Sequence, residues 1–273
     1  MEKTHDAMKI SNVLIRMEND KIFSMIMQIE EIIQKVIFNN FKEGHNKKDT
    51  TVVLLIGDDE NDKIEFFGEI SKHEIKKIHQ DEKDENNKSI ENDEIKIPVL
   101  NYIVEKDIIF CDCYQIFKKQ NDIQEIINSY TIYRLLSQGM NIRIIILSSF
   151  DDIIELNGKK IRERCLSVEK FIPIPEILKS IVSLIITKMD KDKYDCKHFL
   201  DNINPENSFL LNDFKNNLSD CERRVFGFHL LDSSNNSKFS EMENIDKFIK
   251  EGESISIKPK FSLKSSTISK IIN

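Results

Sequence analysis

The sequence predicts an α/β fold, a three-layer sandwich around a mainly parallel sheet of about six strands, with an amphipathic helix at its amino-terminal end. Short aliphatic runs alternate with stretches whose apolar residues recur every three or four positions. The first run, Thr51–Ile56, is aliphatic or β-branched throughout and stops at Gly57, which is typical of a central strand covered on both faces. A chain of 273 residues, 40% of them hydrophobic, can bury a substantial core.

The amino-terminal segment, residues 1–50, is predicted to hold one amphipathic helix or a helix pair. Most apolar residues between positions 7 and 41 are three or four apart, among charged and amide residues. We expect this helix to dock on the domain that follows. Self-association or binding of a protein partner through it, as in a coiled coil, is the alternative. The polar residues 43–49 are interpreted as a linker.

The core domain, residues 51–232, contains the remaining strands. A helical pattern over 64–78 and a polar loop over 81–92 follow the first strand. The next two strands, 95–104 and 107–111, are two residues apart and are therefore predicted to be antiparallel neighbours. Further predicted elements are helices over 120–138, 159–171, 194–203 and 209–218 and strands over 142–147, 183–186 and 225–230. Residues 233–273 are predicted to form a helix over 239–249 and a flexible tail.

Composition excludes several classes of partner. The chain has 47 acidic and 40 basic residues, a net charge of -7, which lacks the basic footprint of a nucleic-acid binder. Its five cysteines are scattered and odd in number, which favours free thiols in a reducing cytoplasm. No apolar run reaches the roughly 18 residues that a membrane span needs. We therefore expect a cytoplasmic protein with no membrane span and no nucleic-acid partner.

Candidate site residues follow the strands, because open α/β sheets bind ligands at the carboxyl ends of their strands. After the first strand, Gly57 and Lys63 have the spacing of a phosphate-binding loop, in which backbone amides and the lysine hold the phosphates. Asp62 and Ile64 replace the second glycine and the magnesium-binding hydroxyl of such a loop. The alternative interpretation is an ordinary acidic turn, whose carboxylates cap the following helix and complement its dipole.

Two later strands end in further signals. Asp112 closes one strand, at the place where an aspartate that supports Mg²⁺ is expected. The strand over 183–186 leads directly into Thr187, Lys188 and Asp190, which form the pattern Thr-Lys-x-Asp. The three partial signals occur in the order that a GTP-binding domain requires.

In these residues the stretch from about Thr51 to Leu230 resembles the G domain of TRAFAC-class P-loop GTPases, closest to septin-like and immunity-associated GTPases. The resemblance implies binding of GTP or GDP together with Mg²⁺. It assigns Gly57 and Lys63 to the phosphates, Asp112 to the magnesium ion, and Thr187, Lys188 and Asp190 to the guanine base.

The departures from the family pattern predict weak nucleotide binding and impaired or absent GTP hydrolysis, with no catalytic residue to assign. With isoleucine at position 64, Mg²⁺ keeps only Asp112 among the expected protein ligands, whereas phosphoryl transfer relies on that ion. The acidic residues between Gly57 and Lys63 also oppose the binding of phosphate. One carboxylate about 4 Å from a phosphate oxygen costs roughly 4 kcal/mol at an effective dielectric constant near 20.

Two other functions remain open at the level of sequence. The first is a pseudo-GTPase scaffold, which binds protein partners without a nucleotide. The second is a receiver-like phospho-acceptor domain, in which Asp58 and Asp59 form an acidic pair, Asp112 is phosphorylated, and Ser148 or Ser149 and Lys188 contact the phosphate. The two-residue connection between positions 104 and 107 opposes the receiver, which needs a crossover helix there. The extra strand over 225–230 opposes it as well.

Overall fold

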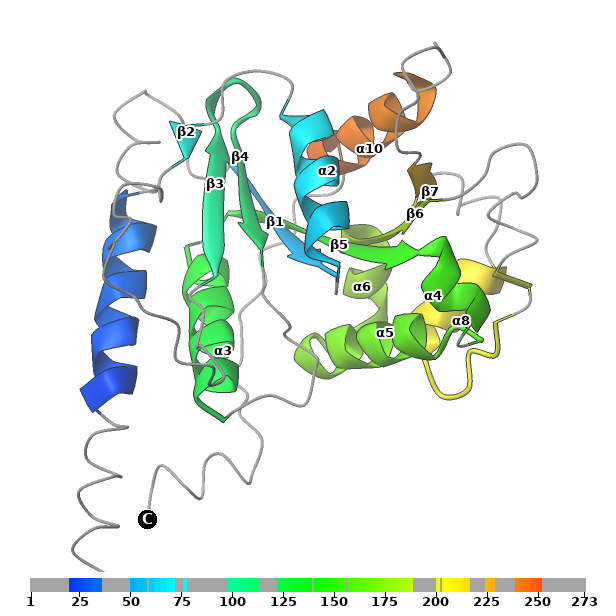
Figure 1. The fold of residues 1–273 in the computed structure, drawn as a ribbon, viewed down its shortest axis with the longest axis horizontal. Helices are drawn as coiled ribbons and strands as arrows, with labels where there is room; N and C mark the ends of the chain where they lie inside the picture. Colours follow the sequence, from blue (N-terminus) through cyan, green and yellow to red (C-terminus); the bar gives the residue numbers. More distant parts are fainter. Residues whose placement is uncertain are drawn as a thin grey trace, which may run out of the picture.

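One mixed sheet of seven strands forms the middle layer of the fold (Figure 1). The computed structural model describes residues 20–35, 50–57, 59–71, 76–77, 98–112, 122–138, 140–155, 157–188, 200–201, 203–216, 224–228 and 239–251. The strand order is β2-β3-β4-β1-β5-β6-β7. The strands are β1 (Thr51–Ile56), β2 (Lys76–Lys77), β3 (Val99–Ile103), β4 (Ile108–Asp112), β5 (Asn141–Ser149), β6 (Val182–Thr187) and β7 (Val225–Phe228).

Strand β1 is central, as its continuous apolar run predicts. It pairs in parallel with β4 on one side and with β5 on the other, and all six of its residues are buried. The parallel arrangement continues from β5 through β6 to β7. Only the short strand β2 and strand β3 bring antiparallel pairs into the sheet. The prediction of an α/β fold with a mainly parallel sheet is therefore confirmed.

The β3–β4 connection confirms the predicted antiparallel pair. A single 3-10 turn, η1 (Val104–Lys106), joins the two strands, and Asp107 follows it with a φ of 54°. The Asp107 carboxylate accepts hydrogen bonds from Thr50 Oγ1 at 2.9 Å and from Tyr102 Oη at 3.1 Å. Aspartate is among the few residues that adopt a left-handed conformation at low cost, which suits it to this position in the turn. Its two side-chain hydrogen bonds then hold the turn in place.

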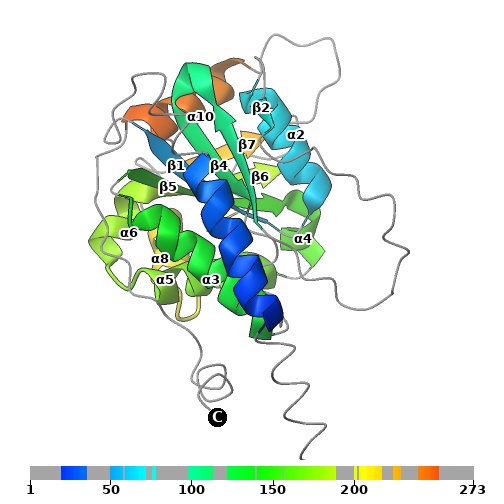
Figure 2. The ribbon, with the colours of Figure 1, turned by 90° about the vertical axis from the view of Figure 1, so that its left-hand side faces the viewer.

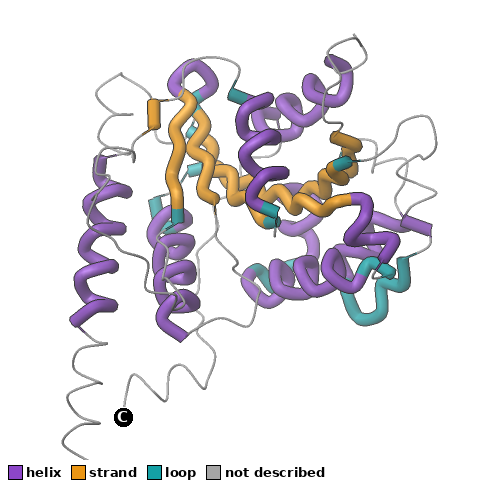
Figure 3. Tube along the Cα trace, viewed as in Figure 1, coloured by secondary structure: helices purple, strands orange, loops and turns teal. Residues whose placement is uncertain are grey.

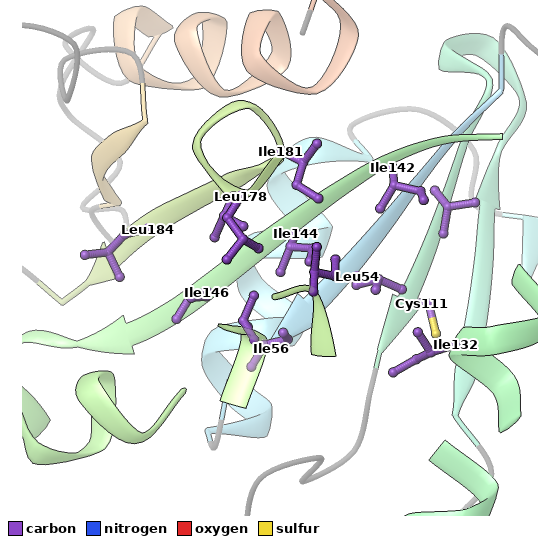
Figure 4. Packing of buried hydrophobic residues seen from close by; sticks show 14 of the residues in the cluster. Leu54, Ile56, Cys111, Ile132, Ile142, Ile144, Ile146, Leu178, Ile181 and Leu184 are labelled. Carbon is purple, nitrogen blue, oxygen red and sulfur yellow. The ribbon is translucent and has the colours of Figure 1, made fainter. Parts of the chain in front are cut away.

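Helices cover both faces of the sheet, so that the molecule has three layers (Figure 3). On one face, α2 (Glu60–Ile70) and α10 (Phe239–Glu251) pack against alternate residues of the strands, such as Val53 and Ile145. On the other, α3 (Asp122–Leu136), α5 (Lys159–Phe171), α6 (Pro175–Ile181) and α8 (Phe209–Asn216) bury the larger cluster. Figure 4 shows Leu178 and Ile181 of α6 over Ile144 of β5.

The helix over residues 20–35 docks on the same chain, beside α3 (Figure 2). Ile29 and Ile33 are buried in the larger cluster, as the apolar spacing of the segment predicts. At the same contact, Glu30 accepts hydrogen bonds from Tyr130 and Arg134 of α3, the latter through both carboxylate oxygens. The hydrogen bond from Arg134 holds the pKa of Glu30 below its usual range, although partial burial acts in the opposite direction.

Polar contacts from residues far away in the sequence hold helices α8 and α10 in place. Arg143 of β5 is buried and donates through Nε to the carbonyl oxygen of Phe248 in α10 at 3.0 Å. Its guanidinium also lies 5.8 Å from the centre of the Phe248 ring. At the start of α8, Glu169 of α5 accepts hydrogen bonds from Ser208 Oγ at 2.8 Å and from Leu210 N at 2.7 Å. The hydrogen bond from Leu210 N satisfies one of the backbone donors that a helix start otherwise leaves open.

Some predicted elements differ from those observed. The predicted helix over 64–78 was wrong in its last part, because α2 ends at Ile70 and Lys76–Lys77 form the edge strand β2. Two short helices were missed, α4 (Phe150–Glu155) and α6. Ser148 and Ser149 are the last residues of β5 instead of following it. The polar loop over 81–92, most of the helix predicted over 194–203 and the tail lie outside the described residues.

Candidate functional site

The candidate site lies at the carboxyl edge of the sheet, which we define as the carboxyl ends of the parallel strands β1, β4, β5 and β6. Strand β1 leads into α2 on one face, whereas the next described helix after β4 is α3 on the other face. Such a change of face between neighbouring strands is where open α/β sheets form ligand-binding crevices. The predicted site residues Gly57, Lys63, Asp112, Thr187 and Lys188 all lie at this edge.

The turn between β1 and α2 is an aspartate-capped helix start. Asp59 is the N-cap, and its Oδ1 accepts from the backbone N–H of Asn61 at 2.9 Å and of Asp62 at 3.3 Å. Gly57 follows β1, and a Cβ at this position would lie 3.1 Å from the Cβ of Leu147 in β5. The capping role that the sequence left as an alternative is therefore observed for Asp59. Asp58 lies outside the described residues.

Lys63 and Asp112, assigned by the resemblance to phosphate and to magnesium, bind each other. Lys63 Nζ donates to Asp112 Oδ1 at 2.6 Å. The Lys63 side chain is only 3% exposed, whereas that of Asp112 is 31% exposed. The pair joins the first turn of α2 to the end of β4. The lysine therefore has its counter-charge within the chain.

Thr187 and Lys188 bind the acidic residues at the start of α2. The buried hydroxyl of Thr187 donates to Asp62 Oδ2 at 2.6 Å. Lys188 Nζ lies 2.8 Å from Asp59 Oδ2 and 2.8 Å from Asp62 Oδ1, and only the contact with Asp59 has hydrogen-bond geometry. The end of β6 is thereby tied to the β1–α2 turn. Lys188 holds this position with a φ of 57°, unusual for a residue other than glycine.

The pKa shifts have the signs that these contacts require. The hydrogen bond to Asp59, followed by the ion pair with Asp62, raises the pKa of Lys188. Hydrogen bonding from Lys188 likewise lowers the pKa of Asp59, although partial burial opposes the shift. Both groups are therefore charged at neutral pH. Lys63 therefore has one carboxylate as its partner among the ion pairs of this edge, and Lys188 has two.

Ile64 and Asp190 are the remaining positions of the family pattern. Ile64, at the position of the magnesium-binding hydroxyl, points outward and is 67% exposed. Asp190 lies outside the described residues, so its assignment to guanine stays a prediction. Within the described part of the chain, no group of three or more His, Cys, Asp or Glu side chains is arranged to hold a metal ion. The assignment of Asp112 to magnesium also stays a prediction.

Sequence reasoning identified most residues of the cluster but missed the role of Asp62. The family pattern places Asp62 where a phosphate-binding loop has glycine and gives it no role. In the structure its buried carboxylate is the partner of both Thr187 and Lys188. A signal was present in the spacing. Asp59 and Asp62 are three residues apart at a helix start, which places both on the same side of the first turn.

One cavity lies between the sheet and the helices of the larger cluster. It has a volume of about 20 Å³ and an entirely apolar lining. A space of this size holds about one water molecule, and water needs polar partners to stay in it. The lining of this cavity therefore offers no polar partner to a water molecule or to a polar ligand. Its lining residues are Leu54, Ile56, Ile132, Leu136, Ile144, Val168, Phe171 and Ile172.

Comparison with known proteins identifies no family. No protein-family model matches the sequence, and neither the curated proteins nor the solved structures include a match. None of the helices in the described part of the chain has the length and apolar composition of a membrane span. The residues at the carboxyl edge are therefore the basis on which a function is inferred.

Proposed function

We propose that this chain is a pseudo-GTPase module, a G-domain-like scaffold that works without a bound nucleotide. One observation carries the proposal. The two lysines that a nucleotide would contact, Lys63 and Lys188, are already neutralised by carboxylates of the same chain. A triphosphate that contacts Lys63 or Lys188 therefore has to displace internal ion pairs.

The G-domain part of the proposal is supported by the position of the residues in the sheet. The resemblance requires the strand before Asp112 to lie beside the strand before Gly57, and β4 pairs with β1. It also requires the Thr-Lys-x-Asp segment to come close to the phosphate loop, and Lys188 reaches Asp59 and Asp62. This support is a fold-level analogy, and a shared fold is stronger evidence of shared ancestry than of shared activity.

The nucleotide-free part of the proposal follows from charge. A phosphate beside Lys63 would also lie near the carboxylate of Asp112, and one beside Lys188 would lie near those of Asp59 and Asp62. At an effective dielectric constant near 20, each carboxylate about 4 Å from a phosphate oxygen costs roughly 4 kcal/mol, which weakens binding by about three orders of magnitude. Two such carboxylates outweigh the contact with one lysine.

The second candidate is weak binding of GTP or GDP with Mg²⁺, without efficient hydrolysis. It is favoured by the convergence of Gly57, Lys63, Thr187 and Lys188 at the carboxyl edge of the sheet. Hydrolysis is opposed by Ile64, whose exposed aliphatic side chain offers no ligand to magnesium. The receiver-like alternative has less support, because β3 runs antiparallel to β4 and a 3-10 turn stands where a crossover helix is needed.

Titration calorimetry with GDP, GTP and ATP in the presence of Mg²⁺ tests the proposal. We expect no heat of binding with any of the three. Binding with a preference for guanine would overturn the proposal in favour of the second candidate. In that case Asp190→Ala should abolish the preference over adenine, and an unchanged preference would show that the base lies elsewhere.

A scaffold also needs a surface for its partner, and we propose the outer side of residues 20–35. Phe23 and Met27, one helical turn apart, are 66% and 53% exposed. A protein partner and a second copy of this chain are both compatible with such a stripe. Sedimentation velocity over a range of concentrations tests self-association, which Phe23→Glu with Met27→Glu should abolish if it uses this surface.

A further inference from the structure

The buried carboxylate of Asp62 is held as a bound anion would be held. The side chain is 3% exposed, and each of its oxygens faces a donor from the end of β6. Oδ2 accepts from Thr187 Oγ1 at 2.6 Å, and Oδ1 lies 2.8 Å from Lys188 Nζ. We infer that Asp62 is a tethered anion in a latent oxyanion site, and that its carboxylate autoinhibits this site. The inference deepens the proposed function and rests on it.

The donors belong to an element far from Asp62 in sequence, so they are positioned independently of it. Thr187 is the last residue of β6, and its backbone is fixed by pairing with β5 and β7. Lys188 has a left-handed backbone and forms a second ion pair with Asp59. Strand pairing and the Asp59 contact keep the hydroxyl and the ammonium in place when the Asp62 side chain is absent.

Removal of the Asp62 carboxylate leaves a site with the chemistry of an oxyanion receptor. The Thr187 hydroxyl is buried, and a buried donor without an acceptor is costly. Lys188 loses one of its two carboxylates, so the local charge becomes more positive. The start of α2, an 11-residue helix, also favours a negative charge at this point. A small oxyanion such as phosphate satisfies all three requirements.

The test compares the wild-type chain with Asp62→Gly, using inorganic phosphate as the probe. Thermal unfolding is followed by circular dichroism in phosphate and in sodium chloride of equal ionic strength. For the wild-type chain we expect only the small rise that a kosmotropic anion gives any folded protein. For Asp62→Gly we expect a rise in the unfolding midpoint of about 5–10 °C at a phosphate concentration 100 times the Kd.

Matched variants separate anion binding from a general effect on stability. Asp62→Asn keeps the size of the side chain and fills the same space, so phosphate should raise its midpoint no more than that of the wild-type chain. Thr187→Val in the Asp62→Gly background removes one donor and should reduce the rise by at least half. If Asp62→Gly is unfolded in chloride, phosphate should refold it.

Two results would overturn the inference. One is a folded Asp62→Gly variant whose midpoint rises in phosphate by only that small amount, or an unfolded one that phosphate fails to refold. The other is an equal phosphate-specific rise in the wild-type chain, because Asp62 would then not block the site. Nucleotide binding by the wild-type chain would instead refute the proposed function, so the two failures are distinguishable.

Discussion

The ion pair between Lys63 and Asp112 allows a quantitative test of how the carboxyl edge is held together. At an effective dielectric constant near 20, unit charges 2.6 Å apart attract by about 6 kcal/mol, and desolvation of the lysine offsets much of this gain. We expect Asp112→Asn to lower the free energy of unfolding by about 3 kcal/mol, because it removes the counter-charge of a buried ammonium.

Removal of the lysine should lower the free energy of unfolding by less than removal of the carboxylate. Lys63→Met places an apolar side chain of similar length in the same space, and Asp112 is exposed enough to be hydrated. We expect a loss of about 1 kcal/mol, and about 1.5 kcal/mol for the double variant. The double variant is then about 2.5 kcal/mol more stable than the sum of the single losses predicts.

Urea unfolding followed by far-ultraviolet circular dichroism measures these differences, since the chain contains no tryptophan. The loss for Asp112→Asn corresponds to a fall in Tm of about 6–12 °C. Single losses that add within about 0.5 kcal/mol would refute the reasoning, because contacting residues that contribute jointly are not additive. A greater loss for Lys63→Met than for Asp112→Asn would also contradict it.

Two further predictions concern other parts of the fold. Glu30→Gln should increase hydrogen exchange in the helix over residues 20–35. Because the native pKa of Glu30 is lowered, its stabilising effect is present above the ordinary value of 4.5 and is lost as the pH falls through the lowered value, so docking should weaken only in acid. Gly158→Ala should cost about 1–3 kcal/mol, since φ is +70° and the new Cβ would lie 2.5 Å from Ile203 Cγ2. Gly68→Ala, in open space on α2, should instead stabilise the chain by about 0.5–1 kcal/mol in thermal unfolding.

The sequence was most informative where hydrophobic pattern alone decides structure. The helix predicted over 159–171 has the bounds of α5, because its apolar face is regular and prolines follow it. The same prolines conceal α6 in the sequence, because they follow a predicted helix as stop signals do, although proline is well accommodated in the first turn of a helix, where Pro175 lies. The edge strand Lys76–Lys77 has no apolar residues to reveal it. Pairing with β3 alone defines it as a strand.

For the candidate site, the sequence predicted which residues lie together at the carboxyl edge, but it did not predict which of them form ion pairs. Position after a strand was enough to place Lys63, Asp112 and Lys188 at one edge, because parallel strands end on the same side. The choice of partner depends on side-chain reach and on the twist of the sheet. A resemblance to a nucleotide-binding family assigns an external phosphate to Lys63, whereas the fold supplies Asp112.

Helix α10 has a consequence for the order of events during protein synthesis. Ile245 and Ile249 are fully buried in the smaller hydrophobic cluster, and Arg143 is fastened to the carbonyl of Phe248, 105 residues later. The part of this face that α10 covers therefore stays exposed until residues 239–251 have left the ribosome. At a synthesis rate of about 5–20 residues per second, these apolar strands are made several seconds before the helix that covers them. Ribosome-bound chains that stop before α10 should therefore be targets for chaperones that recognise exposed aliphatic strands.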